Sequence, residues 1–239
     1  MGAVSVKRKS SDLTEFYIQF LIVVYLLWSF PVLSFGQKEV LVPADGTVSE
    51  GEEQLVVALT FDDGPSGTST PVLLEGLRNR GVRATFFVVG ENAEKGENAQ
   101  LLRDTSADGH LIGHHTYHPV NLSKMSAEQA QAELDATDEL VRKITGKYPI
   151  YARAPYGEVP ENGDVDRQRF YIGWTVDPLD WMTEDVSRIT QSVLEKVEPG
   201  DIILLHDSYL SSVQAALRIV DALQGKGYEF ITVDQMISD

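Results

Sequence analysis

Short apolar runs alternate with longer amphipathic stretches from residue 54 to the C-terminus. The apolar runs have the length of buried strands, and the stretches between them have the length and polarity of helices. Strands are predicted at 55–59, 83–89, 110–112, 150–153, 170–176, 201–205 and 228–233. Strands that alternate with helices form parallel sheets, so we expect one α/β domain over 54–239, with about seven parallel strands in a barrel or a doubly wound sheet.

The helices between these strands have recognisable end signals. Thr70 and Pro71 predict a start with an N-cap and a proline at the first position, and Gly81 predicts the end. Ser126 and Gln129 form a capping box at the start of a long helix. Helices are predicted over 70–81, from the second strand to about 108, and over 126–146, 186–197 and 212–224.

The N-terminal segment has a different pattern, in which a basic cluster precedes a long uncharged stretch. Residues 7–9 are Lys-Arg-Lys, and residues 16–36 carry no charge. This order is typical of export signals. The length favours a membrane anchor, one hydrophobic helix within 1–36, over a signal peptide cleaved after the small residues Ser34 and Gly36. Residues 37–53 are predicted to be a flexible linker, so the domain that follows is expected outside the cytoplasmic membrane.

The composition excludes some classes of function. The net charge of −16 argues against a nucleic-acid partner, because phosphate binding needs lysine and arginine. The chain has no cysteine, which excludes a disulfide framework and a thiolate metal site.

Two polar motifs point to hydrolytic chemistry. Asp62 and Asp63 follow the first predicted strand, and four of the five histidines lie within 110–118. Adjacent carboxylates repel each other, and a fold tolerates them mainly where a cation or a proton transfer needs both. Two imidazoles and a carboxylate are a typical hydrolytic metal site, with positions open for water and substrate. The alternative, a turn rich in Asp and Gly beside a solvated histidine loop, could explain either motif alone, but the two motifs together favour a metal-assisted hydrolase.

Polar residues follow other predicted strands as well. They occur at 153–157, 177–181 and 206–207. The carboxyl ends of parallel strands share one face of a barrel, where active sites are built. We therefore expect all these motifs to form a single site.

These motifs resemble those of the polysaccharide deacetylase family, whose catalytic domain is also called the NodB homology domain. The resemblance covers 57–237 in the family's order and rests on 60–65, on 153–157 with Ala154 where proline is usual, on 177–181 and on 204–206. It implies a distorted (β/α) barrel. It also implies a metal-dependent hydrolase that releases acetate from an N-acetylated glycan, such as peptidoglycan or a chitin-like N-acetylglucosamine polymer.

The histidine motif departs from the family pattern, His-Ser/Thr-x-x-His. His115 and Thr116 match its start, but the second histidine position is Pro119. His114 and His118 have the family spacing but misplace Thr116. His115 and His118 would share one face of a helical turn. We predict His115 and His118 as metal ligands, with His114 as the alternative to His115.

The resemblance implies roles for the acid pair. Asp63 would be the carboxylate ligand of a divalent cation, Zn²⁺ or a similar ion such as Co²⁺. Asp62 would be the general base on the metal-bound water, whose pKa the cation lowers. Arg153 would pair with Asp62 and keep it ionised.

The resemblance also implies a general acid on the other side of the substrate. His206 would protonate the leaving nitrogen, because imidazole has a pKa near neutrality. Asp180 would orient His206 and raise its pKa, with Asp177 as an alternative that the sequence does not separate.

Three further residues are predicted to bind substrate. The backbone N–H of Tyr156 would stabilise the oxyanion. Trp181 and Leu205 would line the pocket for the acetyl methyl group, and Trp174 is expected in the core.

A second class of function stays open at this point. The same fold could be a catalytically impaired, metal-free glycan-binding domain, for which Pro119 is the support.

Overall fold

The computed structural model describes residues 54–159 and 169–238. The predicted hydrophobic helix within 1–36 and the predicted linker at 37–53 lie outside these residues. In the part of the chain that is described, no helix combines the length and the apolar character that a membrane span requires.

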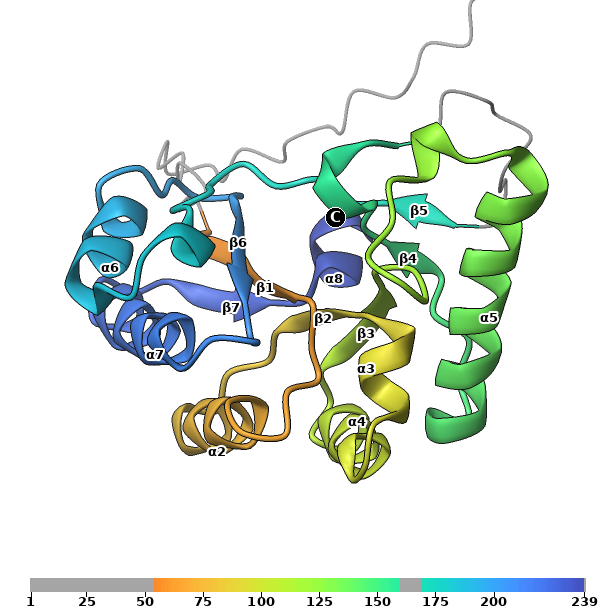
Figure 1. Ribbon diagram of the computed structural model, residues 1–239. Helices are drawn as coiled ribbons and strands as arrows, with labels where there is room; N and C mark the ends of the chain where they lie inside the picture. Colours follow the sequence, from red (N-terminus) through yellow and green to blue (C-terminus); the bar gives the residue numbers. More distant parts are fainter. Residues whose placement is uncertain (1–53, 160–168, 239) are drawn as a thin grey trace, which may run out of the picture. The chain divides into compact units, whose positions relative to one another are not determined.

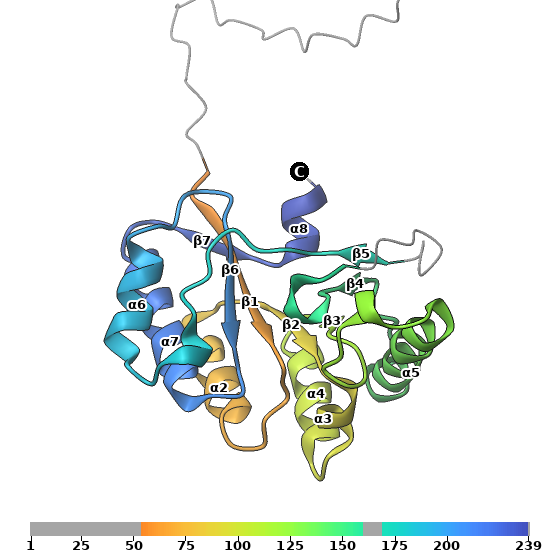
Figure 2. The same ribbon diagram turned by 45° about the horizontal axis from the view of Figure 1, so that its top comes forward.

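A curved sheet of seven parallel strands forms the centre of the described domain (Figures 1 and 2). The strand order is β5-β4-β3-β2-β1-β6, and β7 pairs with the beginning of β1. Every predicted strand is present, and the curled sheet is of the barrel type and not doubly wound. The strands are β1 (Val56–Asp62), β2 (Thr85–Val88), β3 (Leu111–His114), β4 (Tyr151–Ala152), β5 (Phe170–Tyr171), β6 (Ile202–His206) and β7 (Glu229–Ile231).

The longer helices lie around the outside of this sheet (Figure 1). The polar helix predicted before residue 108 is two helices, and the chain turns between them at Gly96, which has a φ of 53°. A last helix follows β7, where the strand was predicted to continue. The α-helices are α2 (Thr70–Arg80), α3 (Gly90–Glu94), α4 (Asn98–Ala107), α5 (Ala127–Thr145), α6 (Val186–Leu194), α7 (Leu210–Gln224) and α8 (Val233–Ser238).

The helix ends follow the sequence signals with one exception. Ser126 accepts a hydrogen bond from the N–H of Gln129, which confirms the capping box of α5. Gly81 ends α2 in the left-handed conformation, with a φ of 64°. The N-cap of α2 is Ser69 and not Thr70, and neither side chain caps the helix, because both hydroxyls donate to Asp207.

The two faces of β1 have different roles. Leu59 and Phe61 belong to the main core, which β1 and β6 share with α2 and α7. Because successive side chains of a strand point to opposite faces, Thr60 and Asp62 point to the inner face of the curved sheet. The core therefore holds the strand in place, while its polar positions face inward and toward its carboxyl end.

Candidate active site

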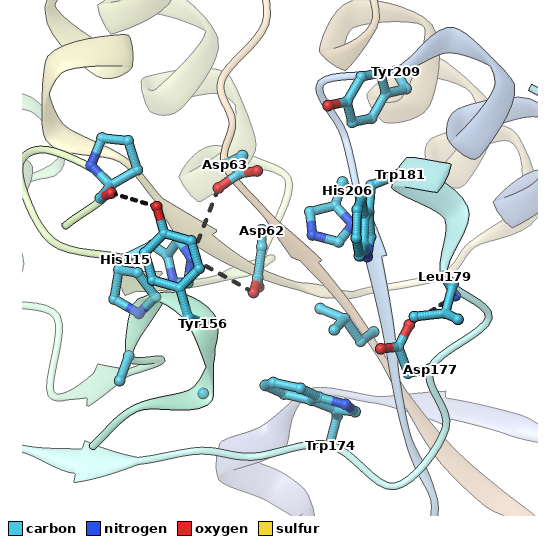
Figure 3. Close-up of a pocket in the computed structure, with 15 residues that line it drawn as sticks. Asp62, Asp63, His115, Tyr156, Trp174, Asp177, Leu179, Trp181, His206 and Tyr209 are labelled. Atoms are coloured by element: carbon cyan, nitrogen blue, oxygen red, sulfur yellow. Dashed lines mark hydrogen bonds and ion pairs between the residues drawn. The ribbon is translucent and has the colours of Figure 1, made fainter. Parts of the chain in front are cut away.

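One cavity of about 490 Å³ lies at the carboxyl ends of the strands (Figure 3). Its walls come from the acid pair after β1, His115 after β3, residues 154–157 after β4, residues between 174 and 181, and His206 at the end of β6. The predicted strand-end motifs therefore share one site.

Asp62 is held from behind by the buried Arg153. Nη1 of Arg153 donates to Oδ1 of Asp62 at 2.9 Å and to the hydroxyl of Thr60 at 2.8 Å. Its Nε and Nη2 donate to the carbonyls of Ile172 and Gly173. Arg153 is 1% exposed and Asp62 is 3% exposed, so removing either would leave a buried charge without its partner.

His115 is oriented by the main chain of the same arginine. Its Nδ1 lies 2.7 Å from the carbonyl oxygen of Arg153. Because a carbonyl only accepts, Nδ1 is the donor in this contact, which leaves Nε2 as the nitrogen that faces the site. That Nε2 is 3.7 Å from Oδ1 of Asp63 and 3.9 Å from Oδ2 of Asp62. The ring thus points its free nitrogen at the acid pair.

Asp63 turns away from the strand in an unusual backbone conformation. Its φ is 72°, in the left-handed region that non-glycine residues rarely adopt. Its carbonyl accepts a hydrogen bond from Nδ2 of Asn92 at 2.8 Å, which helps to hold this conformation. The turn brings the Asp63 carboxylate to His115 at the cavity wall.

His118 does not join His115 and Asp63, which corrects the predicted pairing of the two histidines. Its side chain is 52% exposed, and its Nδ1 lies 2.9 Å from Oε1 of Glu133. His115 and His118 would share a face only in a helical turn, but Thr116 has a φ of 66° and this segment forms no helix. The backbone turn sends His118 to the surface.

The alternative histidine, His114, is buried in the interior. It is fully inaccessible, and its Nε2 lies 3.6 Å from Oδ1 of Asp138. Burial, with smaller effects from Arg169 and His115, lowers the pKa of His114 to about 3, so the ring is neutral. His114 is outside the cavity lining and serves the core instead.

His206 is the cationic group of the site. Its Nδ1 lies 2.8 Å from Oδ1 of Asp180, and its backbone N–H donates to Oδ2 of Asp180 at 2.9 Å. Burial lowers the pKa of His206, but the hydrogen bond and charge of Asp180, with the charges of Asp62 and Asp63, raise it to about 9. Asp177, the alternative partner, instead accepts from the N–H of Leu179 at 2.8 Å.

The apolar walls differ in part from the prediction. Trp181 lines the cavity as predicted, but Leu204 takes the place of Leu205, which is completely buried in the core. Period two on β6 explains this, because Leu204 shares a strand face with His206. Trp174 also lines the cavity and not the core. The predicted strand over 170–176 contained Trp174, but β5 ends at Tyr171, so Trp174 follows the strand end.

Tyr156 lies across the cavity from His206 (Figure 3). It has a φ of 63° and is 73% exposed. Its hydroxyl donates to the carbonyl oxygen of Pro119 at 3.1 Å. Tyr156 and Pro119 therefore form one wall of the cavity together.

A third carboxyl group, Asp207, lies behind the acid pair and was assigned no role from the sequence. Burial and the charges of Asp63 and Asp62 raise its pKa to about 7, against a lowering hydrogen bond from Thr70 at 2.5 Å. It packs directly on the loop after the acid pair, since a Cβ at Gly64 would lie 2.2 Å from its Oδ1. Asp207 thus ties that loop to the end of β6 and the start of α2.

The predicted ligand set does not fit a three-ligand metal site. Catalytic zinc sites use three protein ligands and leave a further position open. Asp63 and His115 converge, but His118 does not. Across 54–159 and 169–238, no three His, Cys, Asp or Glu side chains form a group that could hold a metal ion.

The sequence matches known proteins along most of the domain. Residues 49–168 match the family model described as polysaccharide deacetylase. A peptidoglycan-N-acetylglucosamine deacetylase of Bacillus cereus is 37% identical over 187 residues, which cover 75% of this chain and 67% of that protein. PgdA of Listeria monocytogenes, another peptidoglycan-N-acetylglucosamine deacetylase, is 33% identical over 77% of this chain, but the chain spans only 39% of its length.

Two solved structures are similar to this chain over most of its length. The peptidoglycan deacetylase PdaC from Bacillus subtilis has a TM-score of 0.74 and 32% identity, covering 77% of this chain and 91% of that one. A family 4 acetyl xylan esterase from Clostridium thermocellum, solved in complex with a cobalt ion, has a TM-score of 0.72 and 30% identity, covering 77% and 90%.

Proposed function

Because the chain belongs to the polysaccharide deacetylase family, we propose that it hydrolyses the N-acetyl groups of a glycan that contains N-acetylglucosamine. The products would be acetate and the free amine of the sugar. Peptidoglycan is the favoured substrate, since the relatives above are named for it. The observation that carries the proposal is that Asp62 and His206 line one cavity, each held by an oppositely charged partner.

Asp62 has the position of a general base. Arg153 occupies its Oδ1, while its Oδ2 is on the side of His115 and the cavity. We assign to this oxygen the proton of the attacking water. As the O–H bond breaks, the water oxygen forms a bond to the acetyl carbonyl carbon.

His206 has the position and the charge of a general acid. Asp180 binds its Nδ1, which leaves Nε2 as the nitrogen available to substrate. With a pKa near 9, the ring is protonated at neutral pH. We assign to Nε2–H the proton that the amide nitrogen gains when the C–N bond breaks, because that nitrogen leaves as an amine.

The cavity walls suit the rest of the substrate. Trp181, Trp174 and Leu204 supply apolar surface for the acetyl methyl group. We retain the backbone N–H of Tyr156 as the donor to the oxyanion. Trp181 is 53% exposed, so its ring is also available to pack on a sugar.

The proposal includes a divalent cation, Zn²⁺ or Co²⁺. Asp63 and His115 are the side chains we assign to it, because their Oδ1 and Nε2 point at each other across 3.7 Å. The proposal also places the domain outside the cytoplasmic membrane, and the basic cluster and uncharged stretch of the N-terminal segment support this.

Acetate release from N-acetylglucosamine oligomers, with Zn²⁺ or Co²⁺ in excess, tests the function. Asp62→Asn and His206→Ala should each lower kcat by about 10²–10⁴, the usual contribution of a positioned base or acid. Glu139→Gln, on the exposed surface of α5, is the control and should behave as the parent. Parental rates in both site variants would exclude the assigned roles, and no release by the parent would exclude the activity.

A metal-free glycan-binding domain is the second candidate. Pro119 at the cavity wall and the outward position of His118 favour it. This candidate predicts that the parent binds N-acetylglucosamine oligomers without releasing acetate at any metal concentration.

A further inference from the structure

We propose that this chain holds its cation through only two side chains, Asp63 and His115, because Pro119 occupies the third ligand direction without offering a ligand atom. The result is a weak, readily exchanged metal site, so that activity follows the free metal concentration. The inference rests on the proposed function for the presence of a cation at this site.

The two ligands are already arranged for a cation. Nε2 of His115 is free, because Nδ1 donates to the carbonyl of Arg153. Ligand bonds to Zn²⁺ are about 2.0–2.2 Å long, so two ligands of one ion lie about 3–4 Å apart. The 3.7 Å between Nε2 of His115 and Oδ1 of Asp63 falls in this range.

Pro119 lies on the wall of the same cavity as these two residues. Its ring carries no donor atom for a metal, and its backbone nitrogen has no free lone pair or hydrogen. The one remaining ligand atom, the carbonyl oxygen, already accepts a hydrogen bond from the Tyr156 hydroxyl (dashed line in Figure 3). The side chain of Pro119 therefore supplies no ligand atom to this wall of the cavity.

His118 is prevented from taking this place. Glu133 holds it twice, through Nδ1 at 2.9 Å and through the backbone N–H at 2.8 Å. Its ring packs edge-on against Tyr117 with the centroids 4.8 Å apart, and its carbonyl accepts from the hydroxyl of Thr116. Turning His118 into the cavity would break these contacts.

The neighbouring carboxylates have other tasks. Asp62 is bound to Arg153 through Oδ1, and its Oδ2, 3.9 Å from Nε2 of His115, is the oxygen assigned to the attacking water. Asp177 accepts from the N–H of Leu179. Among the described residues no third acid or histidine completes the group. Loss of a partner behind a metal ligand typically costs 10–100-fold in affinity, so a missing direct ligand should cost about 100-fold or more.

Titration of the metal-free chain with Zn²⁺, without substrate, tests the inference. Pro119→His should lower the dissociation constant about 100-fold or more. The matched control Pro119→Ala, which removes the ring but adds no ligand, should bind Zn²⁺ like the parent. His118→Ala should also bind like the parent, while His115→Ala, which removes a direct ligand, should lose about 100-fold or more in affinity.

Two results would overturn the inference. If Pro119→His binds Zn²⁺ no more tightly than Pro119→Ala, position 119 does not face the cation. If His118→Ala loses as much affinity for Zn²⁺ as His115→Ala, about 100-fold or more, His118 is a ligand. Should Pro119→His fail to fold, the comparison of His118→Ala with His115→Ala still decides the matter.

Acetate release separates this inference from the proposed function. If both hold, the metal concentration that gives half-maximal release falls in Pro119→His. If the titrations come out as expected but saturating metal gives no release, the function fails and the two-ligand site stands. If the parent releases acetate but Pro119→His binds Zn²⁺ no more tightly than the parent, only the inference fails.

Discussion

Replacing Asp180 with asparagine should move the pH dependence of catalysis in a specific direction. Asp180 accepts from both Nδ1 and the backbone N–H of His206, and its hydrogen bond and charge are the largest influences that raise the pKa of His206 to about 9. Without that charge the pKa should fall towards its ordinary value of 6.5. The difference corresponds to about 3 kcal/mol between the two protonation states.

The expected loss of rate follows from the protonated fraction of His206. At pH 8 a group with a pKa of 9 is about 90% protonated, and one with a pKa of 6.5 is about 3% protonated. Asp180→Asn should therefore lose about 20-fold more in kcat/KM near pH 8 than near pH 6. The kcat/KM of Asp180→Asn is therefore compared with that of the parent at both pH values. Loss of the charge lowers this ratio more at pH 8 than at pH 6, whereas a general loss of orientation lowers it equally at both.

The assay is acetate release over pH 5–10 at saturating metal. Asp177→Asn is the matched control, because it lies in the same loop but binds the N–H of Leu179, and its basic limb should stay near pH 9. The role given to Asp180 would be refuted if the basic limb of the pH–rate profile stays in place in Asp180→Asn, or if both variants shift it equally.

The pair of His206 and Asp180 also stabilises the fold at pH values below 6.5, and this contribution is lost as pH rises through about 9.

Three predictions concern stability. Gly64→Ala should lower the free energy of unfolding by about 1–3 kcal/mol, because its Cβ would lie 2.2 Å from Oδ1 of Asp207. Gly173→Ala, whose Cβ would meet no atom within 4 Å, should be nearly neutral, and denaturant unfolding of both variants measures the difference. Leu205→Ala should lower it by about 2–5 kcal/mol but leave KM near the parent's value, and a raised KM would place the side chain at the cavity after all. His114 takes up a proton in the unfolded chain below pH 6.5 but not in the fold, so the parent should lose stability as pH falls. His114→Gln should remove about 2 kcal/mol of that loss between pH 7 and 5, which urea unfolding at both pH values measures.

The strands and helices could be predicted because their signals are local. Apolar runs mark the strands, and capping residues such as Ser126 mark the helix ends. Parallel pairing then brings the strand ends together, so the site's location follows from the topology. This is why Asp62, Asp63, His115 and His206 were found at one cavity.

Which side chains near the strand ends face the cavity depends on backbone turns, and the pattern of apolar and polar residues does not encode these turns. The left-handed conformation of Thr116 sends His118 outward. A similar turn at Leu179, with a φ of 55°, directs Asp180 and not Asp177 to His206. The choice between Leu204 and Leu205 was accessible, because the alternation of β6 with His206 in the cavity specifies it.

Arg153 supports both Asp62 and His115, but it does so through different atoms, and this has an evolutionary consequence. Its guanidinium holds Asp62, but its carbonyl oxygen holds His115, and every amino acid has that oxygen. A mutation at this position that leaves the fold intact can therefore remove the support of the base while the carbonyl oxygen still orients the imidazole. Descendants of such a protein would lose turnover first and retain the geometry of cation binding, which leaves them a short mutational route back.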